Sequence, residues 1–128
     1  MFRCSSLGAL FEIGDGHAAQ GDGEVDQTAI ETSLRGRVQL TVRKDRRLVW
    51  PRAETSTDYI SMASDEDLTV ATSVAVQEMV DFLAATKKLT KHEAYQLVSL
   101  AGNVGITQLV DRPVYGVHVK MPKNIFKK

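Results

Sequence analysis

The residues best suited to chemistry lie in a glycine-rich segment near the N-terminus, between residues 14 and 24. Two Gly-Asp-Gly steps each lead to another side chain that can bind a metal ion, so that Asp15 is followed by His17, and Asp22 by Glu24. In extended backbone, residues two apart point to the same side, so each pair is expected to share a side. A compact turn between the pairs would gather all four groups. Imidazole and carboxylate ligands suit zinc, and several carboxylates also suit calcium.

A plainer interpretation of this segment is a glycine-rich turn whose acids cap nearby backbone amides. An EF-hand does not fit, because the acid, Asn and Gly positions required after Asp15 are absent. A phosphate-binding loop fits poorly, since the acids would repel phosphate and no Gly-Lys-Thr/Ser follows. The chain has no Gly-x-Ser-x-Gly nucleophile elbow, and Cys4 has no obvious base nearby. The residues alone leave a metal site and a structural turn open.

The elements around this segment are predicted to be strands, then two helices, then strands, which favours an α+β fold rich in β structure. An apolar run predicts a strand over 7–13, and strict alternation predicts a hairpin from 38–42 and 48–50. A further short strand is expected over 59–63. Ser64 as N-cap candidate, followed by the acids of residues 65–67, predicts the start of a helix that Lys87 and Lys88 close. A Thr90–Glu93 capping box predicts the start of a second helix. Strands are expected again over 106–110 and 114–121.

Helical spacing and strand alternation also predict which side chains are buried. In the two helices the expected buried positions are Leu68, Ala71, Ala75, Met79, Phe82, Leu83, Ala94, Leu97, Val98 and Ala101. Trp50 and Tyr59 are expected in the core or an interface. His92, in the first turn of a helix, is expected at the surface. His118 alternates away from the apolar side of its strand, which predicts that it faces solvent or an interface, or lines the site.

Composition sets the limits on the class of protein. The chain has 128 residues with 16 basic and 16 acidic side chains, which fits one domain or part of a larger one. Zero net charge argues against a nucleic-acid or membrane-surface partner. No apolar run approaches about 18 residues, so we expect no transmembrane helix. A single cysteine excludes an internal disulfide and suits the cytoplasm, and residues 1–7 are too short and too weakly apolar for a signal peptide.

The charges are unevenly distributed along the chain. Residues 12–31 contain six acids and no Lys or Arg, whereas residues 35–52 contain seven basic side chains and the single acid Asp45. An acidic stretch repels itself unless a cation lies within it. The cation could be the following basic segment or a metal ion, or the stretch could be a solvated loop.

The glycine-rich segment lies within a longer pattern that resembles the acetamidase/formamidase family. The pattern runs over residues 8–11, 14–25 and 28–31, and continues more loosely through residues 50–55, the helix after Asp67, and residues 108–111 and 117–123. The resemblance implies a metal-dependent, oligomeric enzyme with a larger fold that contains a β-sandwich. It implies hydrolysis of the non-peptide carbon–nitrogen bond of small linear amides such as formamide or acetamide, giving ammonia and a carboxylate.

The resemblance also implies roles for individual residues. The metal, expected to be zinc with calcium as an alternative, is assigned to Asp15, His17 and Asp22. Glu24 is assigned as the general base, or alternatively as a further ligand. Contact with the substrate, or support of the metal ligands, is assigned to Gln20, Gly21 and Gly23.

Family chains are two to three times as long as this one, and the resemblance is to their C-terminal portion only. Residues 1–7 do not resemble the family, so we expect a leader there, followed by a single domain or the C-terminal part of a family domain. Two hypotheses remain: an amidohydrolase, or a truncated, non-catalytic remnant that binds a metal or a partner. The expected partners are a small amide and either further copies of the chain or the missing N-terminal half, without nucleic acid or membrane.

Overall fold

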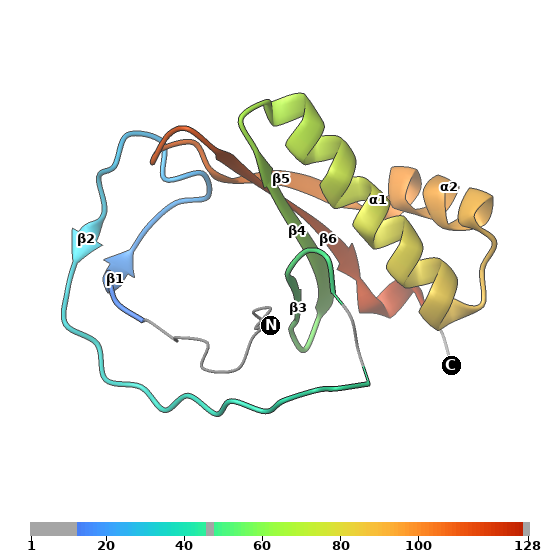
Figure 1. The fold of residues 1–128 in the computed structure, drawn as a ribbon, viewed down its shortest axis with the longest axis horizontal. Helices are drawn as coiled ribbons and strands as arrows, with labels where there is room; N and C mark the ends of the chain where they lie inside the picture. Colours follow the sequence, from blue (N-terminus) through green and yellow to red (C-terminus); the bar gives the residue numbers. More distant parts are fainter. Residues whose placement is uncertain (1–12, 46–47, 127–128) are drawn as a thin grey trace.

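A computed structural model describes residues 13–45 and 48–126 of the chain (Figure 1). The predicted strand over 7–13 lies almost entirely outside these residues. The described elements, in chain order, are β1 (His17–Ala19), β2 (Ile30–Glu31), β3 (Arg52–Glu54), β4 (Asp58–Asp65), α1 (Leu68–Lys87), α2 (Lys91–Ala101), β5 (Asn103–Gln108), β6 (Tyr115–Pro122) and the short 3-10 helix η1 (Lys123–Ile125). The expected α+β class is confirmed.

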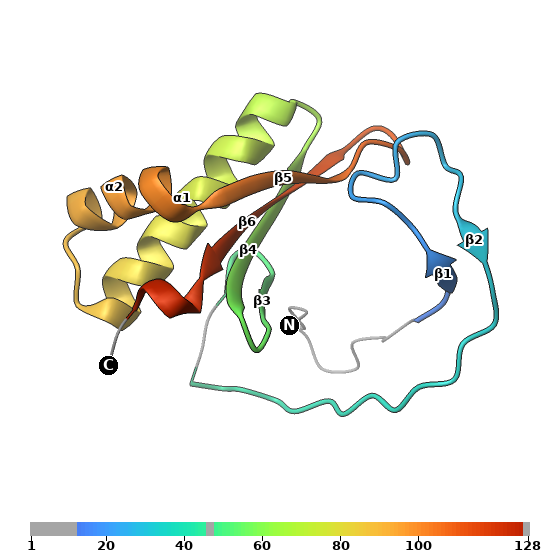
Figure 2. The same ribbon diagram turned by 180° about the vertical axis from the view of Figure 1, so that it is seen from behind.

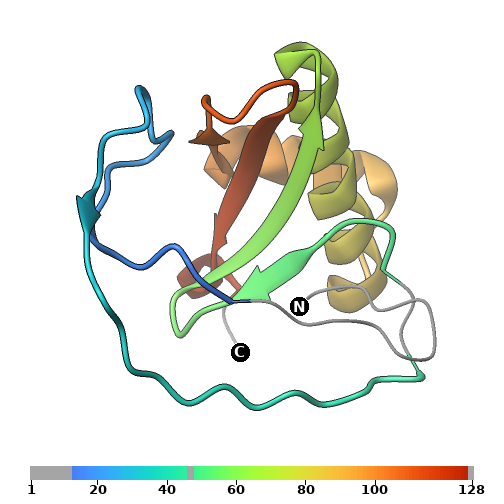
Figure 3. The same ribbon diagram turned by 60° about the vertical axis from the view of Figure 1, so that its left-hand side comes forward.

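The centre of the fold is a four-stranded antiparallel sheet in the order β3-β4-β6-β5. Helix α1 crosses one face of this sheet, packing on β4 and β6, and α2 packs beside α1 (Figure 2). Strands β1 and β2 form a separate two-stranded ribbon. The segment that carries this ribbon runs as a wide arc on the side of the sheet away from the helices (Figure 3). The glycine-rich segment is part of this arc and does not lie on the helical layer (Figure 3).

Helix α1 ends as the sequence predicts, but it begins later than expected, because its N-cap is Asp67 and not Ser64. The side chain of Asp67 accepts hydrogen bonds from the backbone N–H groups of Thr69 and Val70, at 2.7 and 3.3 Å. This cap satisfies donors that would otherwise have no partner in the first turn, and it lowers the pKa of Asp67. The helix ends at Lys88, whose φ of 58° lies in the left-handed region. Its buried residues are Ala71, Ala75, Met79, Val80 and Leu83.

The small residues of α1 let it approach β4 closely. The buried hydroxyl of Ser61 on β4 donates a hydrogen bond of 2.7 Å to the carbonyl oxygen of Ala75. By length and composition alone α1 could also cross a membrane, with a mean hydropathy of 1.3. However, its buried residues form the core with Val117, Val119 and Met121 of β6. This packing is that of a core helix on a sheet.

The predicted capping box opens α2. The Thr90 hydroxyl accepts the backbone N–H of Glu93, and the Glu93 carboxylate accepts the backbone N–H of Thr90 at 2.8 Å. Ala94 and Val98 are buried, whereas Leu97 and Ala101 are only partly covered. His92 is exposed, as predicted. Trp50 and Tyr59 pack against the core, which is also as expected.

The predicted hairpin of residues 38–42 and 48–50 is wrong. Residues 32–43 belong to no helix or strand, and Val38, Leu40 and Val42 are all more than half exposed. Alternation favours a strand only when one face of the strand can be buried. No part of the chain that the structure describes covers the apolar face of residues 38–42. A turn is present at Lys44 and Asp45, between the two segments of the predicted hairpin. A strand does form directly after Pro51, where β3 pairs with β4.

The prediction that His118 could face solvent is also wrong. It points away from Val117 and Val119, as its position in β6 requires, yet it is only 8% exposed. Its Nδ1 lies 2.8 Å from the hydroxyl of Thr107 on β5. A Cβ at Gly105 would lie only 2.6 Å from the His118 Nε2, so glycine makes room for the ring. Alternation gave the correct side of the strand, but tertiary contacts decide whether that side is covered.

We expect the buried imidazole of His118 to make stability depend on pH. Burial, with a smaller contribution from the positive charge of Lys120, lowers its pKa, while Asp22 opposes the shift. The folded state therefore favours neutral imidazole. Its stabilisation is complete above the unfolded pKa of about 6.5 and is lost as the pH falls below that value. The free energy of unfolding, measured in urea at about pH 8 and about pH 5.5, should fall less in His118→Asn than in the unsubstituted protein.

The matched control for this experiment is His92→Asn, which removes an exposed histidine from α2. It should retain the full pH dependence. Equal pH dependence of the unsubstituted protein and His118→Asn would contradict the assignment to His118.

Candidate metal centre

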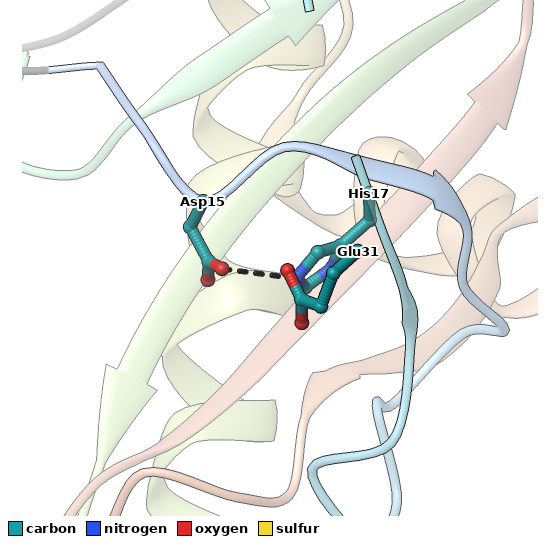
Figure 4. Close-up of side chains that lie close together, drawn as sticks. All are labelled: Asp15, His17 and Glu31. Carbon is teal, nitrogen blue, oxygen red and sulfur yellow. Dashed lines mark hydrogen bonds and ion pairs between the residues drawn. The ribbon is translucent and has the colours of Figure 1, made fainter. Parts of the chain in front are cut away.

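Strand pairing between β1 and β2 brings three potential metal ligands together. His17 on β1 lies opposite Glu31 on β2 in the antiparallel register. The Nε2 atom of His17 is 3.0 Å from Oδ1 of Asp15 and 3.2 Å from Oε1 of Glu31. One potential ligand atom from each of the three residues lies within 4.8 Å of the other two (Figure 4). Asp15 and Glu31 are well exposed, so the cluster opens to solvent.

Two backbone features explain why this sequence can form the cluster. Asp15 has a φ of 54°, in the left-handed region that Asp tolerates better than most residues. Gly16 has no Cβ, and a Cβ there would lie 2.7 Å from the carbonyl oxygen of Thr32. This close approach allows the N–H of Thr32 to donate a hydrogen bond of 2.8 Å to the carbonyl of Gly16. The bond holds the two strands together next to the ligands.

Gln20 orients the imidazole from its other side. The Nδ1 of His17 lies 2.5 Å from Oε1 of Gln20, an amide oxygen that can only accept. Nδ1 therefore carries a proton, and in the neutral ring Nε2 is left with its lone pair directed toward the two carboxylates. Without a cation present, the pKa of His17 is raised, first by the Gln20 hydrogen bond. The hydrogen bond and negative charge of Asp15 also raise it, and Glu31 contributes less, while partial burial opposes the shift. This environment favours a positive charge.

The structure brings together Asp15 and His17, which the sequence paired, but not all four predicted groups. Asp22 and Glu24 lie outside the cluster of ligand atoms found among the described residues. The carboxylate of Asp22 is 3.9 Å from the ammonium of Lys120 on β6. Glu24 has a φ of 40°, and its backbone N–H bonds the carbonyl of Gly21 at 3.3 Å. The proposed roles of Asp22 and Glu24 remain predictions.

Glycines 21 and 23 have different surroundings. Gly23 is buried, with a φ of 90°, and its carbonyl accepts the N–H of Leu109 at 2.8 Å just after β5. This bond ties the glycine-rich segment to the main sheet. Gly21 is exposed, with open space where a Cβ would be. Their predicted contact with a substrate stays a prediction.

The third member of the cluster, Glu31, was not identified from the sequence as a site residue. It lies in the 28–31 part of the pattern that resembles the family, which is the only signal that could have indicated it. Its distance from His17 is set by pairing between β1 and β2, and their register shifts between His17 and Ala19. β1 has three residues and β2 has two, and strands this short have too little alternation to predict such a register.

We expect Gly16→Ala to weaken divalent-metal binding by about tenfold, because the methyl group collides with the Thr32 carbonyl and moves Glu31 away from His17. Zinc affinity measured by titration calorimetry checks this. Gly14→Ala is the matched control, since a Cβ at Gly14 meets nothing within 4 Å. Equal zinc affinity of the two variants would show that this close approach does not support the cluster.

Comparisons with known proteins give the same family as the sequence pattern. Residues 4–128 match the family described as the Acetamidase/Formamidase family. No match was found among curated proteins. Three solved structures are each 30% identical to the chain: an acetamidase from Bacillus halodurans, one from Yersinia enterocolitica, and a predicted acetamidase/formamidase from Thermoanaerobacter tengcongensis.

These structures have the same fold in the part that matches. The TM-scores are 0.73, 0.74 and 0.72 in the same order, and the matches cover 86%, 88% and 85% of this chain. They cover only 37%, 34% and 36% of the solved chains, so this chain spans little more than a third of their length. This partial match agrees with the resemblance to the C-terminal portion. The chain belongs to the acetamidase/formamidase family.

Proposed function

We propose that this protein takes part in hydrolysing the carbon–nitrogen bond of small linear amides, with a divalent metal ion held by Asp15, His17 and Glu31. The observation that carries the proposal is the convergence of these three side chains in a member of this family. Formamide and acetamide are the proposed substrates, because the similar solved structures are named acetamidases and one is named a predicted acetamidase/formamidase. A cytoplasmic location is part of the proposal, since a single cysteine suits a reducing compartment.

The chemistry of the three ligands fits zinc. Ligand atoms around a tetrahedral zinc ion, with bonds of about 2.0–2.1 Å, are roughly 3.3 Å apart. The two measured separations from His17 Nε2, 3.0 and 3.2 Å, are close to this spacing. Catalytic zinc sites have three protein ligands and an open fourth position. Calcium fits less well, because it takes six to eight oxygen ligands and one of the three groups here is an imidazole.

A divalent ion at this position would polarise the amide carbonyl and lower the pKa of water to near 7. The chain's own groups would do the rest. Gln20 holds the His17 ring in the tautomer whose Nε2 can bind the ion. Glu24 is the proposed general base, which takes a proton from the attacking water and gives it to the leaving nitrogen. Its carboxylate lies outside the cluster, so this role requires the Glu24 side chain to approach the ligands.

The balance of this reaction is simple. The water oxygen bonds to the carbonyl carbon, the carbon–nitrogen bond breaks, and the proton carried by Glu24 leaves with the nitrogen as ammonia. The other product is formic or acetic acid, whose remaining proton passes to the ammonia, so that the final products near pH 7 are ammonium and formate or acetate.

The first experiment measures metal content and ammonia release from formamide and acetamide, using the purified 128-residue chain. We expect one zinc ion per chain, and ammonia release that depends on it. Glu24→Gln should keep the zinc and lose the ammonia release, while Glu66→Gln, at an exposed position before α1, should behave as the unsubstituted chain. Unchanged ammonia release in Glu24→Gln would remove Glu24 from the mechanism.

A non-catalytic remnant that binds a metal or a partner is the second candidate. It is favoured by one observation, that the chain spans little more than a third of the solved family structures. Stoichiometric zinc without ammonia release would support this candidate. Neither zinc nor ammonia release, from a folded sample, would contradict the metal site in this chain.

A further inference from the structure

Exposed apolar side chains are most numerous in one segment of the described residues, although Ile13 and Val25 before it are also 72% and 68% exposed. Between residues 30 and 49, six large apolar side chains are 52–82% exposed: Ile30, Leu34, Val38, Leu40, Val42 and Val49. In the described part beyond residue 50, only Tyr95, Leu100 and Val104 are more than half exposed. A segment that leaves this many apolar side chains exposed is a candidate interaction site on a folded protein. We call residues 34–43 the apolar arm.

The apolar arm has the sequence of a strand but lacks a strand's partners. Val38, Leu40 and Val42 alternate with Arg37, Gln39, Thr41 and Arg43, so an extended conformation places the apolar residues on one face and polar residues on the other. Residues 32–43 nevertheless form no strand, and every side chain between residues 34 and 43 is exposed. Within residues 13–45 and 48–126, two things are missing: a neighbouring strand for the backbone hydrogen bonds, and an apolar surface to cover Val38, Leu40 and Val42.

A second copy of the same arm is a poor partner. Residues 34–44 contain four basic side chains and no acid. If two arms paired antiparallel around Leu40, Arg37 of one copy would lie opposite Arg43 of the other. Like charges directly opposite each other destabilise a strand pair. Electrostatics therefore favours a partner strand that is acidic or neutral.

The size of the family fold indicates which partner is missing. The solved structures that match this chain share only 34–37% of their length with it, so nearly two-thirds of each has no counterpart here. We propose that the apolar arm is a strand that pairs with, and is covered by, the part of the acetamidase/formamidase fold that this chain does not contain, with acidic or neutral residues opposite Arg37 and Arg43. Glu31 of the metal cluster lies only three residues before the arm.

The test compares the 128-residue chain with a chimera in which it replaces the matched third of the Bacillus halodurans acetamidase. Amide hydrogen exchange of the peptide covering residues 34–43 reports on strand pairing. We expect fast exchange in the chain alone, and exchange slowed more than about tenfold in the chimera, because a paired strand protects its backbone N–H groups. The intact Bacillus acetamidase is the reference for a properly folded protein. This readout needs neither bound metal nor activity, so it is independent of the proposed function.

Leu40→Lys and Leu100→Lys form a matched pair of variants, since both replace an exposed leucine with a charge. In the chimera, Leu40→Lys should restore fast exchange in the arm, while Leu100→Lys, on α2, should leave the protection unchanged. Three results would overturn the proposal: an unfolded chimera, an unprotected arm in a folded chimera, or protection that survives Leu40→Lys. Self-association of the chain alone that Leu40→Lys abolishes, measured by sedimentation, would identify a second copy as the occupant and also overturn it.

Discussion

His17→Ala is expected to lower the affinity of the chain for zinc by more than about 100-fold. His17 is the only nitrogen ligand in the cluster. Its Nε2 lies close to both carboxylates, 3.0 Å from Asp15 and 3.2 Å from Glu31. Removing groups that merely support a ligand costs about 10–100-fold in metal affinity, so losing a ligand should cost more. The two exposed carboxylates left behind are a weak, oxygen-only pair that zinc does not prefer. Titration calorimetry with zinc and metal analysis after dialysis measure the loss.

His92→Ala is the control for this prediction, because His92 is exposed on α2 and belongs to no cluster of potential ligands in the described residues. It should bind one zinc ion as tightly as the unsubstituted chain. Both variants should unfold at the same urea concentration in the absence of metal, since His17 lies on the arc and not in the core. Stoichiometric, tight zinc in His17→Ala would move the metal site elsewhere or remove it.

Leu83→Ala should lower the free energy of unfolding by about 2–5 kcal/mol. Leu83 is fully buried in the cluster between α1 and the sheet, with Met79 one turn before it on the same face. Deleting its branched end removes apolar contacts and leaves a cavity that the surrounding strands can only partly fill. Urea unfolding followed by circular dichroism gives the difference in free energy, provided that the slope with urea is unchanged.

The matched substitution is Leu100→Ala, at a leucine that is 85% exposed on α2. Surface changes of this kind are usually within about 0.5 kcal/mol of neutral. A loss at Leu83 no larger than at Leu100 would mean that α1 is not packed on the sheet as described, and would reopen the question of what its apolar residues face.

The helices and returning strands could be predicted from the sequence because their signals are local. The capping box of Thr90 and Glu93 and the spacing of Ala71, Ala75 and Met79 both depend on residues a few positions apart. Such interactions form within one or two turns, so the same residues produce them in almost any tertiary setting. Asp15 and His17, two residues apart, were also expected to lie together, and their side chains are 3.0 Å apart. The backbone reason differs, because Asp15 has a left-handed φ of 54° and not the extended backbone on which the expectation rested.

The remaining features depend on partners that are distant in the sequence. Whether His118 is covered is decided by β5 and by room at Gly105. Glu31 reaches His17 only through the pairing of β1 with β2, for which short strands carry no signal of register.

The conformation of residues 37–43 also depends on partners that are distant in the sequence. The sequence by itself determined the alternation of residues 37–43 and the polar face that begins and ends with Arg37 and Arg43. A strand also needs backbone hydrogen bonds and an apolar cover from elsewhere. The described residues supply neither, so the arm stays extended and exposed. For this protein, local sequence determined the helices, the strand alternation and the Asp15–His17 pair. Only tertiary contacts decided which faces are buried and which third group joins the metal cluster, because those contacts join segments that no short-range pattern connects.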